Sequence, residues 1–419
     1  MPHSPQRNTK TVETTGMSRG RMGDDMLQIT EKVRCTGCEA CANICPQGCI
    51  VMEEDAEGFY YPVLQPHGCV DCGRCIEVCP VHRVGAGGGR ARAYAAHAAD
   101  RSTVAGSSSG GIFPLLARQV LEQGGAVFGA AFDAELNVRH AVAEGPFALP
   151  ALQGSKYVQS RVGNAYAEAE KMLQAGRAVL FSGAPCQIAG LRSFLGKDYE
   201  QLLCQDMICH SIPSPGAWRR YLYDVEAGEG QPVRTVYFRD KRNGWEHYQL
   251  RLTLADGREL LSTGQDNAYM QAFLRGLSTR PSCYTCPFKG GGYQSDITLG
   301  DFWGVRQVCP EALHEEGTSL VLVHTERGRD AMAALSRQAK VLPVPFSEAV
   351  APNPAYSQPA QPHPKRAQFF QMLHARGFVS CTTELLHPAQ EEAVRKRESS
   401  LMQRAVGKVK RIASDVLKR

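Results

Sequence analysis

The segment CTGCEACANICP at residues 35–46 is followed by a second segment, CVDCGRCIEVCP at residues 69–80, with the same cysteine spacing. Both have the pattern Cys-x2-Cys-x2-Cys-x3-Cys-Pro. This spacing holds paired 4Fe-4S clusters, and the fourth cysteine of each copy binds the other copy's cluster. We therefore predict two 4Fe-4S clusters, on a first cysteine set of Cys35, Cys38, Cys41 and Cys79 and a second set of Cys69, Cys72, Cys75 and Cys45.

Two other interpretations of these eight thiols fit the sequence less well. Structural zinc takes four ligands, usually from two separated cysteine pairs, and a cysteine triplet followed by Cys-Pro does not have that form. Disulfides would require an oxidising compartment and a small disulfide scaffold. Cys49 falls outside both sets and is expected to be a packed thiol.

The composition indicates a reducing compartment. The chain has 419 residues, of which 43% are hydrophobic and 16 are cysteine, enough for several domains with sizeable cores. Residues 1–27 lack the apolar core of a signal peptide, and no apolar run reaches the length of about 18 residues that spans a bilayer. We therefore expect a cytoplasmic protein.

Positive charge is concentrated at the C-terminus. The formal net charge is +5, and residues 391–419 hold nine Lys and Arg against four acidic residues, so the tail accounts for the whole excess. The neutral body argues against nucleic acid as a ligand. Apolar residues within 401–417 recur at helical spacing. This predicts a basic amphipathic helix that contacts a membrane surface or a partner, or packs on its own domain.

The apolar pattern after residue 90 predicts an α/β (α+β) fold with a mixed sheet. The expected strands are 93–98, 126–133, 139–143, 178–182 and 199–209, then 233–239, 247–254, 259–261, 296–299 and 319–324. The expected helices are 110–123, 164–175, 187–195, 268–276 and 328–338. Residues 341–364 are rich in proline and are expected to form a surface connection.

These patterns divide the chain into six predicted parts. They are a disordered leader (1–28), a ferredoxin-type cysteine module (29–84), a glycine linker (85–90), an α/β domain (91–214), a β-rich domain (215–375) and a basic helix or tail (376–419).

Four further cysteines form a third cysteine set, Cys186, Cys209, Cys283 and Cys286. Cys186 follows one expected strand and Cys209 ends the next, at the carboxyl ends where α/β sheets build their sites. Spacing alone leaves zinc, a redox dithiol, simple packing and a third 4Fe-4S cluster open.

A loop of small residues precedes the helix expected at 110–123. Its serines can cap free amides, its glycines allow a ligand to approach the backbone, and the helix N-terminus favours an anion. A phosphate site and a plain N-cap both fit the five loop residues, Ser107, Ser108, Ser109, Gly110 and Gly111. Neither a nicotinamide fingerprint nor an ATP-binding Gly-x4-Gly-Lys-Ser/Thr loop is present.

Four longer phrases occur together: SSSGGIF at 107–113, GSKYVQS at 154–160, GAPCQIAGL at 183–191 and SDITLGDFWG at 295–304. With them, residues 29–375 resemble the beta-subunit family of the deazaflavin (coenzyme F420) hydrogenases and dehydrogenases. That family also includes the plant reductase of 7-hydroxymethyl chlorophyll. Ala184 and Ser211 depart from the family pattern, which affects hydrogen bonds rather than ligand chemistry.

The resemblance implies an iron–sulfur oxidoreductase that contains FAD. It makes the third cysteine set the ligands of a third 4Fe-4S cluster, with Cys204 in reserve and Cys309 and Cys381 as structural thiols. Lys156 and His210 are the implied catalytic residues, a cation near the flavin and a proton donor. The implied cofactor-binding residues are Ser107, Ser108, Ser109, Gly110, Gly111, Lys156, Tyr157, Ser182, Gly183 and Asp301, with Phe302 and Trp303 beside the flavin.

The resulting hypothesis is a flavin oxidoreductase. Electrons pass between the two ferredoxin-type clusters, the third cluster and FAD, and a deazaflavin or another small organic molecule exchanges a hydride with the FAD. The expected protein partner is a ferredoxin or a subunit of a dehydrogenase or hydrogenase. One alternative is an electron-transfer adaptor that has no substrate of its own and docks through the basic tail. Another is a zinc-stabilised binding protein without redox function.

Overall fold

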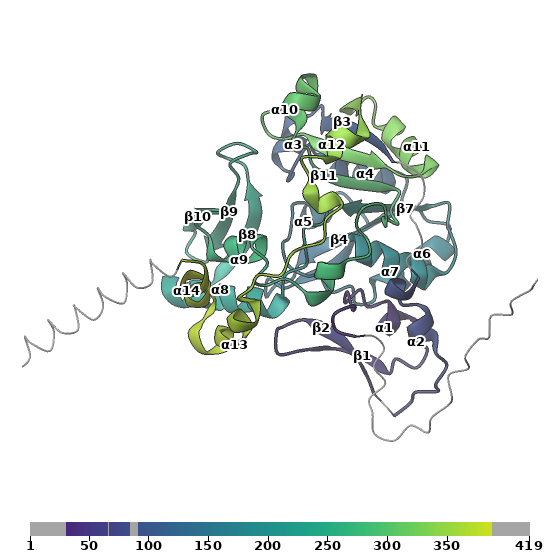
Figure 1. The fold of residues 1–419 in the computed structure, drawn as a ribbon. Coiled ribbons are helices and arrows are strands. Elements are labelled where there is room, and N and C mark those ends of the chain that lie inside the picture. The colour runs from purple at the N-terminus through teal and green to yellow at the C-terminus, as the bar shows by residue number, and fades with distance from the viewer. Residues whose placement is uncertain (1–30, 66, 84–90, 388–419) are drawn as a thin grey trace, which may run out of the picture.

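The computed structural model describes residues 31–65, 67–83 and 91–387. In these ranges the chain forms a large mixed sheet with helices on both faces, a three-stranded sheet beside it and the cysteine module below it (Figure 1). The predicted α/β fold with a mixed sheet is confirmed. The leader, the glycine linker and the amphipathic part of the tail lie outside the described residues.

The large sheet has the strand order β13-β3-β12-β11-β7-β6-β4-β5. Strands β4, β6, β7 and β11 are parallel, and β3 has the same direction because β12 runs antiparallel to both of its neighbours. The carboxyl ends of these strands therefore meet at one edge, where α/β folds bind ligands. The bounds are β3 (Arg92–Ala98), β4 (Ala126–Phe132), β5 (Val138–Ala143), β6 (Val179–Ser182), β7 (Leu202–Met207), β11 (Ile297–Asp301), β12 (Ser319–Val323) and β13 (Ala339–Val344).

Two helical layers cover the faces of this sheet. Helices α4 (Ile112–Glu122) and α11 (Glu326–Ala334) pack on one face. Helices α6 (Ala165–Gln174) and α7 (Pro185–Leu195) pack on the other. Both sides of the central strands are therefore buried, which explains their continuous apolar runs. Shorter helices complete the layers: α3 (Arg101–Ala105), α5 (Leu149–Leu152), α10 (Val305–Val308) and α12 (Phe346–Val350).

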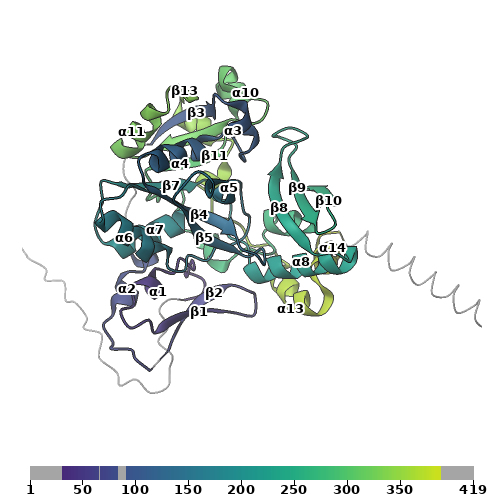
Figure 2. The ribbon, with the colours of Figure 1, turned by 180° about the vertical axis from the view of Figure 1, so that it is seen from behind.

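A second core lies around the small sheet, on the side of the large sheet away from α6 and α7 (Figure 2). Its buried centre is a group of aromatic rings that includes Trp218, Phe238, Tyr269 and Phe378. Its elements are β8 (Val233–Asp240), β9 (Gln249–Leu254), β10 (Glu259–Thr263), α8 (Pro215–Glu229), α9 (Ala268–Leu274), α13 (Arg366–Arg376) and α14 (Phe378–Leu386).

Helix α8 has clear boundary residues in the sequence. The Ser214 hydroxyl accepts a hydrogen bond from the Ala217 amide at the N-cap, Pro215 occupies the first turn, and Gly230 takes the left-handed conformation after the last turn. This Ser-Pro start and glycine stop are typical of helices. The sequence prediction nevertheless missed α8.

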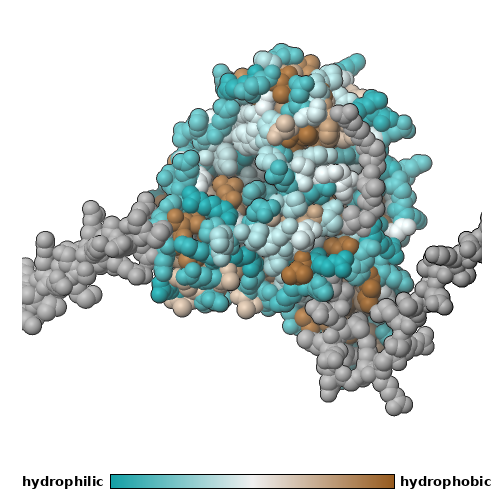
Figure 3. Space-filling model, in the orientation of Figure 1, coloured by the Kyte–Doolittle hydropathy of each residue, from teal (hydrophilic) through white to brown (hydrophobic). Residues whose placement is uncertain are grey.

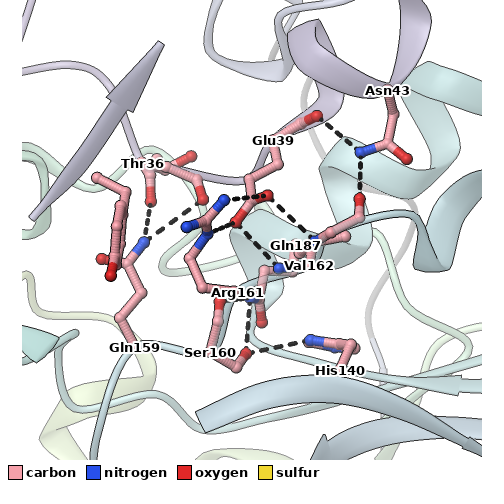
Figure 4. A network of polar contacts seen from close by, with 12 residues as sticks. Thr36, Glu39, Asn43, His140, Gln159, Ser160, Arg161, Val162 and Gln187 are labelled. Atoms are coloured by element: carbon pink, nitrogen blue, oxygen red, sulfur yellow. Dashed lines mark hydrogen bonds and ion pairs between the residues drawn. The ribbon is translucent and has the colours of Figure 1, made fainter. Parts of the chain in front are cut away.

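The cysteine module consists of β1 (Ile50–Glu54), β2 (Tyr60–Leu64), α1 (Ala40–Ile44), α2 (Arg74–Glu77) and a 3-10 turn at Pro80–His82. It docks on the body through Glu39, which is 4% exposed. The Glu39 carboxylate accepts hydrogen bonds from Arg161 Nε at 2.7 Å, from the Val162 amide at 3.0 Å and from the Gly163 amide at 3.1 Å (Figure 4). Only the Glu39 carboxylate of this pair is buried, since Arg161 is 35% exposed, and leaving that carboxylate without its donors would cost about 1–3 kcal/mol or more.

Residues 341–364 are not wholly a surface connection, so that prediction is wrong in part. Residues 341–344 belong to β13, which pairs with β3, and 346–350 form α12. Pro343 is accommodated because β13 is an edge strand with one side free of ladder hydrogen bonds. The strand expected at 199–209 covers only Leu202–Met207, so Cys209 lies in the segment after it.

The predicted domain limits at 214/215 and 375/376 do not coincide with separate cores. The large sheet takes strands from both sides of residue 215. Helix α14, in the part expected to be a tail, buries Phe378, Cys381 and Leu385 in the core around the small sheet. Within the described ranges, no helix is long and apolar enough to cross a membrane. On the face seen in Figure 3, hydrophobic residues form separate patches among hydrophilic ones.

We predict that Phe378→Ala lowers the free energy of unfolding by about 3–5 kcal/mol, because the ring is fully buried among aromatic residues. Val379→Ala is the matched control, since the next side chain of the same helix is 40% exposed, and we expect it to change stability by less than about 0.5 kcal/mol. Urea unfolding measures both. Equal effects of the two variants would show that α14 is not part of the core.

Candidate functional site

The first cysteine set lies in one cavity. Its four thiols line a space of about 330 Å³, open solvent included, together with residues such as Met52 and Pro62. Burial, with the neighbouring Cys35 and Cys79 thiols, raises the pKa of Cys38 to about 12. Without metal the Cys38 thiol is therefore neutral, and metal binding would release its proton.

The second cysteine set lines another cavity, of about 490 Å³ including open solvent. Cys69 and Cys72 are exposed, whereas Cys45 and Cys75 are half-buried. Cys49 also lines this cavity, and its Sγ lies 3.4 Å from the Cys45 Sγ. Cys49 is buried, as expected, but it packs directly beside the second set.

The third cysteine set converges from three separate segments. Cys186 is in the first turn of α7, Cys209 follows β7, and Cys283 and Cys286 lie in and just after the 3-10 turn Pro281–Thr285. All four line one cavity of about 420 Å³, open solvent included. The Ile212 amide donates a hydrogen bond to Cys283 Sγ at 3.3 Å.

The donor chemistry of the three cavities fits iron–sulfur clusters. Four thiols around one cavity are the usual ligand set of a 4Fe-4S cluster. In the part of the chain that the structure describes, no three Cys, His, Asp or Glu side chains are grouped to hold a single metal ion.

The first and third cavities share a wall. Thr36 lines both of them. Gly190, one helical turn after Cys186 on α7, also faces the first set, because a Cβ atom there would lie 3.1 Å from Cys38 Sγ and 2.8 Å from the Tyr166 hydroxyl. Only a residue without a side chain lets α7 approach the cysteine module this closely.

The remaining cysteines lie apart from these cavities. Cys204 is buried within β7, and its amide donates to the Asp296 carboxylate at 2.7 Å. Cys309 and Cys381 are buried in two hydrophobic cores. Of the two departures from the family pattern, Ala184 precedes α7 and its amide donates to the Gln187 side chain, and the Ser211 hydroxyl contacts that of Thr279 at 3.1 Å.

At the carboxyl edge of the sheet, Asp301 ends β11 and meets a cation that the sequence analysis missed. Arg239 of β8 binds both Asp301 carboxylate oxygens, at 2.9 and 3.2 Å, and its side chain is only 3% exposed. Trp245 Nε1 donates to the same carboxylate at 2.7 Å. The Arg239 guanidinium lies 3.7 Å from the centre of the Tyr248 ring. No sequence pattern pointed to Arg239, because its partner is 62 residues away.

The serine hydroxyls of the 107–111 loop form hydrogen bonds with neighbouring residues, which fix the conformation of the loop. Ser107 Oγ donates to the Thr103 carbonyl at 2.7 Å, Ser108 Oγ accepts from the Ser155 amide at 2.7 Å, and Ser109 Oγ donates to the Thr318 carbonyl at 3.1 Å. The Gly110 amide donates to Ser319 Oγ, and Gly111 has the left-handed conformation before α4.

Two cations approach this loop from β8 and the turn after it. Arg239 lies 3.5 Å from the Ser108 carbonyl. Lys241 Nζ donates to the Val104 and Ser109 carbonyls at 2.7 and 3.3 Å. Burial lowers the pKa of Lys241 to about 8. Asp301 already pairs with Arg239, so the positive charge beside the loop that has no ion pair within the described residues is that of Lys241, and it favours an anion.

The other predicted cofactor residues divide into two groups. Tyr157 lies in the Arg239 region, where its hydroxyl is 3.5 Å from the guanidinium. Ser182 and Gly183 instead hydrogen-bond Gln205 of β7. Lys156 Nζ donates to the Ala151, Gln153 and Gly154 carbonyls, so its protons hold its own loop, and burial lowers its pKa to about 7.

His210 connects the third cavity with this region. It lines the cavity, and its ring meets Phe273 edge-on with 5.1 Å between centroids. Phe273 in turn stacks on Tyr157 at 5.1 Å. Two ring contacts therefore lead from the third cysteine set to the Arg239–Asp301 pair.

Family comparisons agree with this division of the chain. Residues 176–347 match the family model for the C-terminal part of the coenzyme F420 hydrogenase/dehydrogenase beta subunit. Residues 34–82 match a 4Fe-4S dicluster domain. The first match contains the third cysteine set and Asp301, and the second contains the first and second sets.

Individual relatives cover shorter parts. A 56-residue stretch is 41% identical to a 7Fe ferredoxin of Hydrogenibacillus schlegelii, over 13% of this chain and 65% of the relative. A 54-residue stretch is 32% identical to the ketoisovalerate oxidoreductase subunit VorC of Methanothermobacter marburgensis, over 12% of this chain and 68% of the relative. A chain of the F420-reducing NiFe hydrogenase complex from Methanosarcina barkeri is 15% identical, with a TM-score of 0.43 over 72% of this chain and 92% of that one.

We predict that Gly190→Ala lowers the iron and sulfide bound per chain, by up to about four of each, because the added methyl group would displace Cys38 or Tyr166. Metal analysis of anaerobically purified protein measures this. The control is Gly228→Ala in α8, where a Cβ atom meets nothing within 4 Å. It should keep its full iron content and gain up to about 1 kcal/mol of stability. Normal iron content and stability in Gly190→Ala would contradict the close packing of α7 on the first set.

Proposed function

Because this chain belongs to the beta-subunit family of coenzyme F420 hydrogenases and dehydrogenases and carries a 4Fe-4S dicluster domain, we propose that it is an iron–sulfur flavoprotein oxidoreductase. It would move electrons between its two ferredoxin-type clusters and FAD through a third cluster. A deazaflavin or another small organic molecule would exchange a hydride with the FAD, in either direction.

The observation that carries this proposal is the continuity of the sites. The first and third cavities share Thr36, and the third cavity leads through His210 and Phe273 to Tyr157. Cys45 of the first motif copy lines the second cavity and Cys79 of the second copy lines the first, so the two sets form one module. This order suits a protein that accepts electrons at one end and delivers them at the other.

Each cysteine set would hold one cluster. A 4Fe-4S cluster supplies one-electron transfer at a potential set by its surroundings. The chain's own contribution is to keep the thiols of the first and third sets buried or half-buried, to hold the two sets on either side of Thr36, and to donate a hydrogen bond from the Ile212 amide to a thiol of the third set.

FAD would lie at the carboxyl edge of the large sheet. It can exchange one or two electrons, which suits a junction between clusters and a hydride acceptor. The 107–111 loop and the start of α4 would bind its diphosphate, with Arg239 and Lys241 supplying positive charge. Tyr157 and Asp301 would lie beside it. Lys156 and His210 remain the proposed catalytic residues, and of these His210 lies between the third set and the Tyr157 ring.

The partners follow from the same proposal. A ferredoxin, or a hydrogenase or dehydrogenase subunit, would exchange electrons with the cysteine module, where Cys69 and Cys72 are exposed. The basic tail, outside the described residues, would be a second contact with a partner or a membrane surface. Turnover of a small acceptor without any partner protein would rule against the adaptor alternative.

We predict about 12 irons, about 12 sulfides and one FAD per chain in anaerobically purified protein. Cys186→Ser should retain about 8 irons, because only the third set is broken, and should slow flavin reduction by a reduced ferredoxin about tenfold or more. Cys309→Ala is the matched control, a buried cysteine outside the three sets, and should behave like the parent. About four irons or fewer in the parent, or about 12 in Cys186→Ser, would refute the scheme.

A second prediction concerns pH. Lys241 has a pKa of about 8 in the folded chain, so its ammonium is present below this pH and is lost as the pH rises through it. FAD affinity should therefore fall above about pH 8, whereas Lys241→Met should bind FAD about tenfold more weakly at pH 7 and lose that pH dependence. Titration of flavin-free protein with FAD measures this. Lys340→Met, at a lysine on β13, is the control. If Lys241→Met binds FAD as tightly as the parent, both at pH 7 and above about pH 8, the FAD diphosphate does not bind at this loop.

A further inference from the structure

Arg280 is a completely buried cation, with 0% of its surface exposed, between the cysteine module and the body. Within the described residues, no carboxylate lies within ion-pairing distance of its guanidinium. Three other arginines that join the body to the module each bind a carboxylate of the module, as the pairs Arg161–Glu39, Arg219–Glu54 and Arg366–Glu57. Arg280 differs from them in both burial and pairing.

The contacts of the guanidinium point to the first cysteine set. Nε donates to the Cys35 carbonyl at 2.7 Å, and one terminal nitrogen lies 3.7 Å from Cys35 Sγ. That nitrogen also donates to the Tyr60 carbonyl at 3.0 Å, and the other terminal nitrogen donates to Gln159 Oε1 at 3.0 Å. The Tyr61 ring lies 4.2 Å from the guanidinium carbon.

These neutral partners accept hydrogen bonds from the Arg280 guanidinium, but none of them carries a negative charge that would balance its positive charge. An isolated buried cation is strongly unfavourable, so it is normally paired with an anion. Four thiolates around an iron–sulfide core supply a net negative charge at this place, and Cys35 is one of the four. The burial of Arg280 is therefore accounted for when the first set holds its cluster.

The backbone of Arg280 also reaches the third set. Its amide donates to the Ile212 carbonyl at 2.8 Å, and the amide of Ile212 donates to Cys283 Sγ. Cys283 follows Arg280 by three residues. Arg280 thus fixes the module's Cys35 to the segment that carries two thiols of the third set.

We propose that Arg280 is the counter-charge of the cluster held by the first cysteine set and raises its reduction potential. Reduction adds one electron from an external donor and breaks no bond, so the cluster becomes more negative by one charge. A fixed cation and an N–H donor at a thiolate sulfur both favour that reduced state. Arg280 is therefore a positioning residue that acts through Cys35, and this role needs only the two clusters of the dicluster domain, not the third cluster or FAD.

The test is a redox titration of the full-length, anaerobically purified protein, followed by electron paramagnetic resonance. In Arg280→Met, one of the dicluster signals should become at least tenfold harder to reduce, which is 59 mV lower for a one-electron couple. Arg219→Gln is the control, since it removes a cation from a more exposed ion pair of the same interface. It should shift the reduction equilibrium by less than about threefold.

A second variant decides the case if Arg280→Met does not retain its iron. Gln159→Glu keeps the arginine but gives it a carboxylate at the position of Gln159 Oε1, so its charge toward the cluster is neutralised. The same signal should again fall in potential. The proposal would be overturned if Arg280→Met retains its iron and has the reduction potentials of the parent. If Arg280→Met does not retain its iron, parent-like reduction potentials in Gln159→Glu would overturn it. Because the readout is a dicluster potential, failure of the third cluster or of FAD binding would leave this result unaffected.

Discussion

The close contact between α7 and the cysteine module is the constraint on which the arrangement of sites depends. Cys186 lies in the first turn of this helix and Gly190 lies one turn later, against Cys38. The same helix therefore carries a thiol of the third set and packs against a thiol of the first set. Glu39 accepts hydrogen bonds from Arg161 and two backbone amides, and these hold the module against the helix. A module displaced from this position would lose both contacts.

Buried positive charge is distributed along the proposed electron path. Arg280 lies at the first cysteine set without a carboxylate, while Lys241 and the Asp301-paired Arg239 contact carbonyls of the serine–glycine loop. Burying cations costs free energy, which anions at these positions would offset. Arg239 already has the Asp301 carboxylate as its partner, whereas no ion pair involves Arg280 or Lys241 within the described residues. The cluster and the diphosphate proposed above would be the missing anions for these two.

Much of the large sheet could be predicted from the sequence, because strands buried on both faces have continuous apolar runs that end at glycine and polar residues. The edge strand β13 was missed because Pro343 and its neighbours resemble a loop, and only pairing with β3 makes them a strand. Helix α14 was assigned to the tail for a similar reason, since its apolar face has meaning only against the rings of α8, α9 and α13. Local patterns do not contain these partners.

By itself, the sequence determined the eight cysteines of the module and their division into two sets, because a ligand triplet and its distant fourth member follow from spacing along one short segment. Only the tertiary structure decided that Cys186, Cys209, Cys283 and Cys286 share a cavity and that Thr36 separates it from the first set. It also decided that Asp301 meets Arg239 and that Arg280 reaches Cys35. These contacts join residues 62 to 245 positions apart, and chain spacing carries no information about them until the sheet and its docked module bring them together.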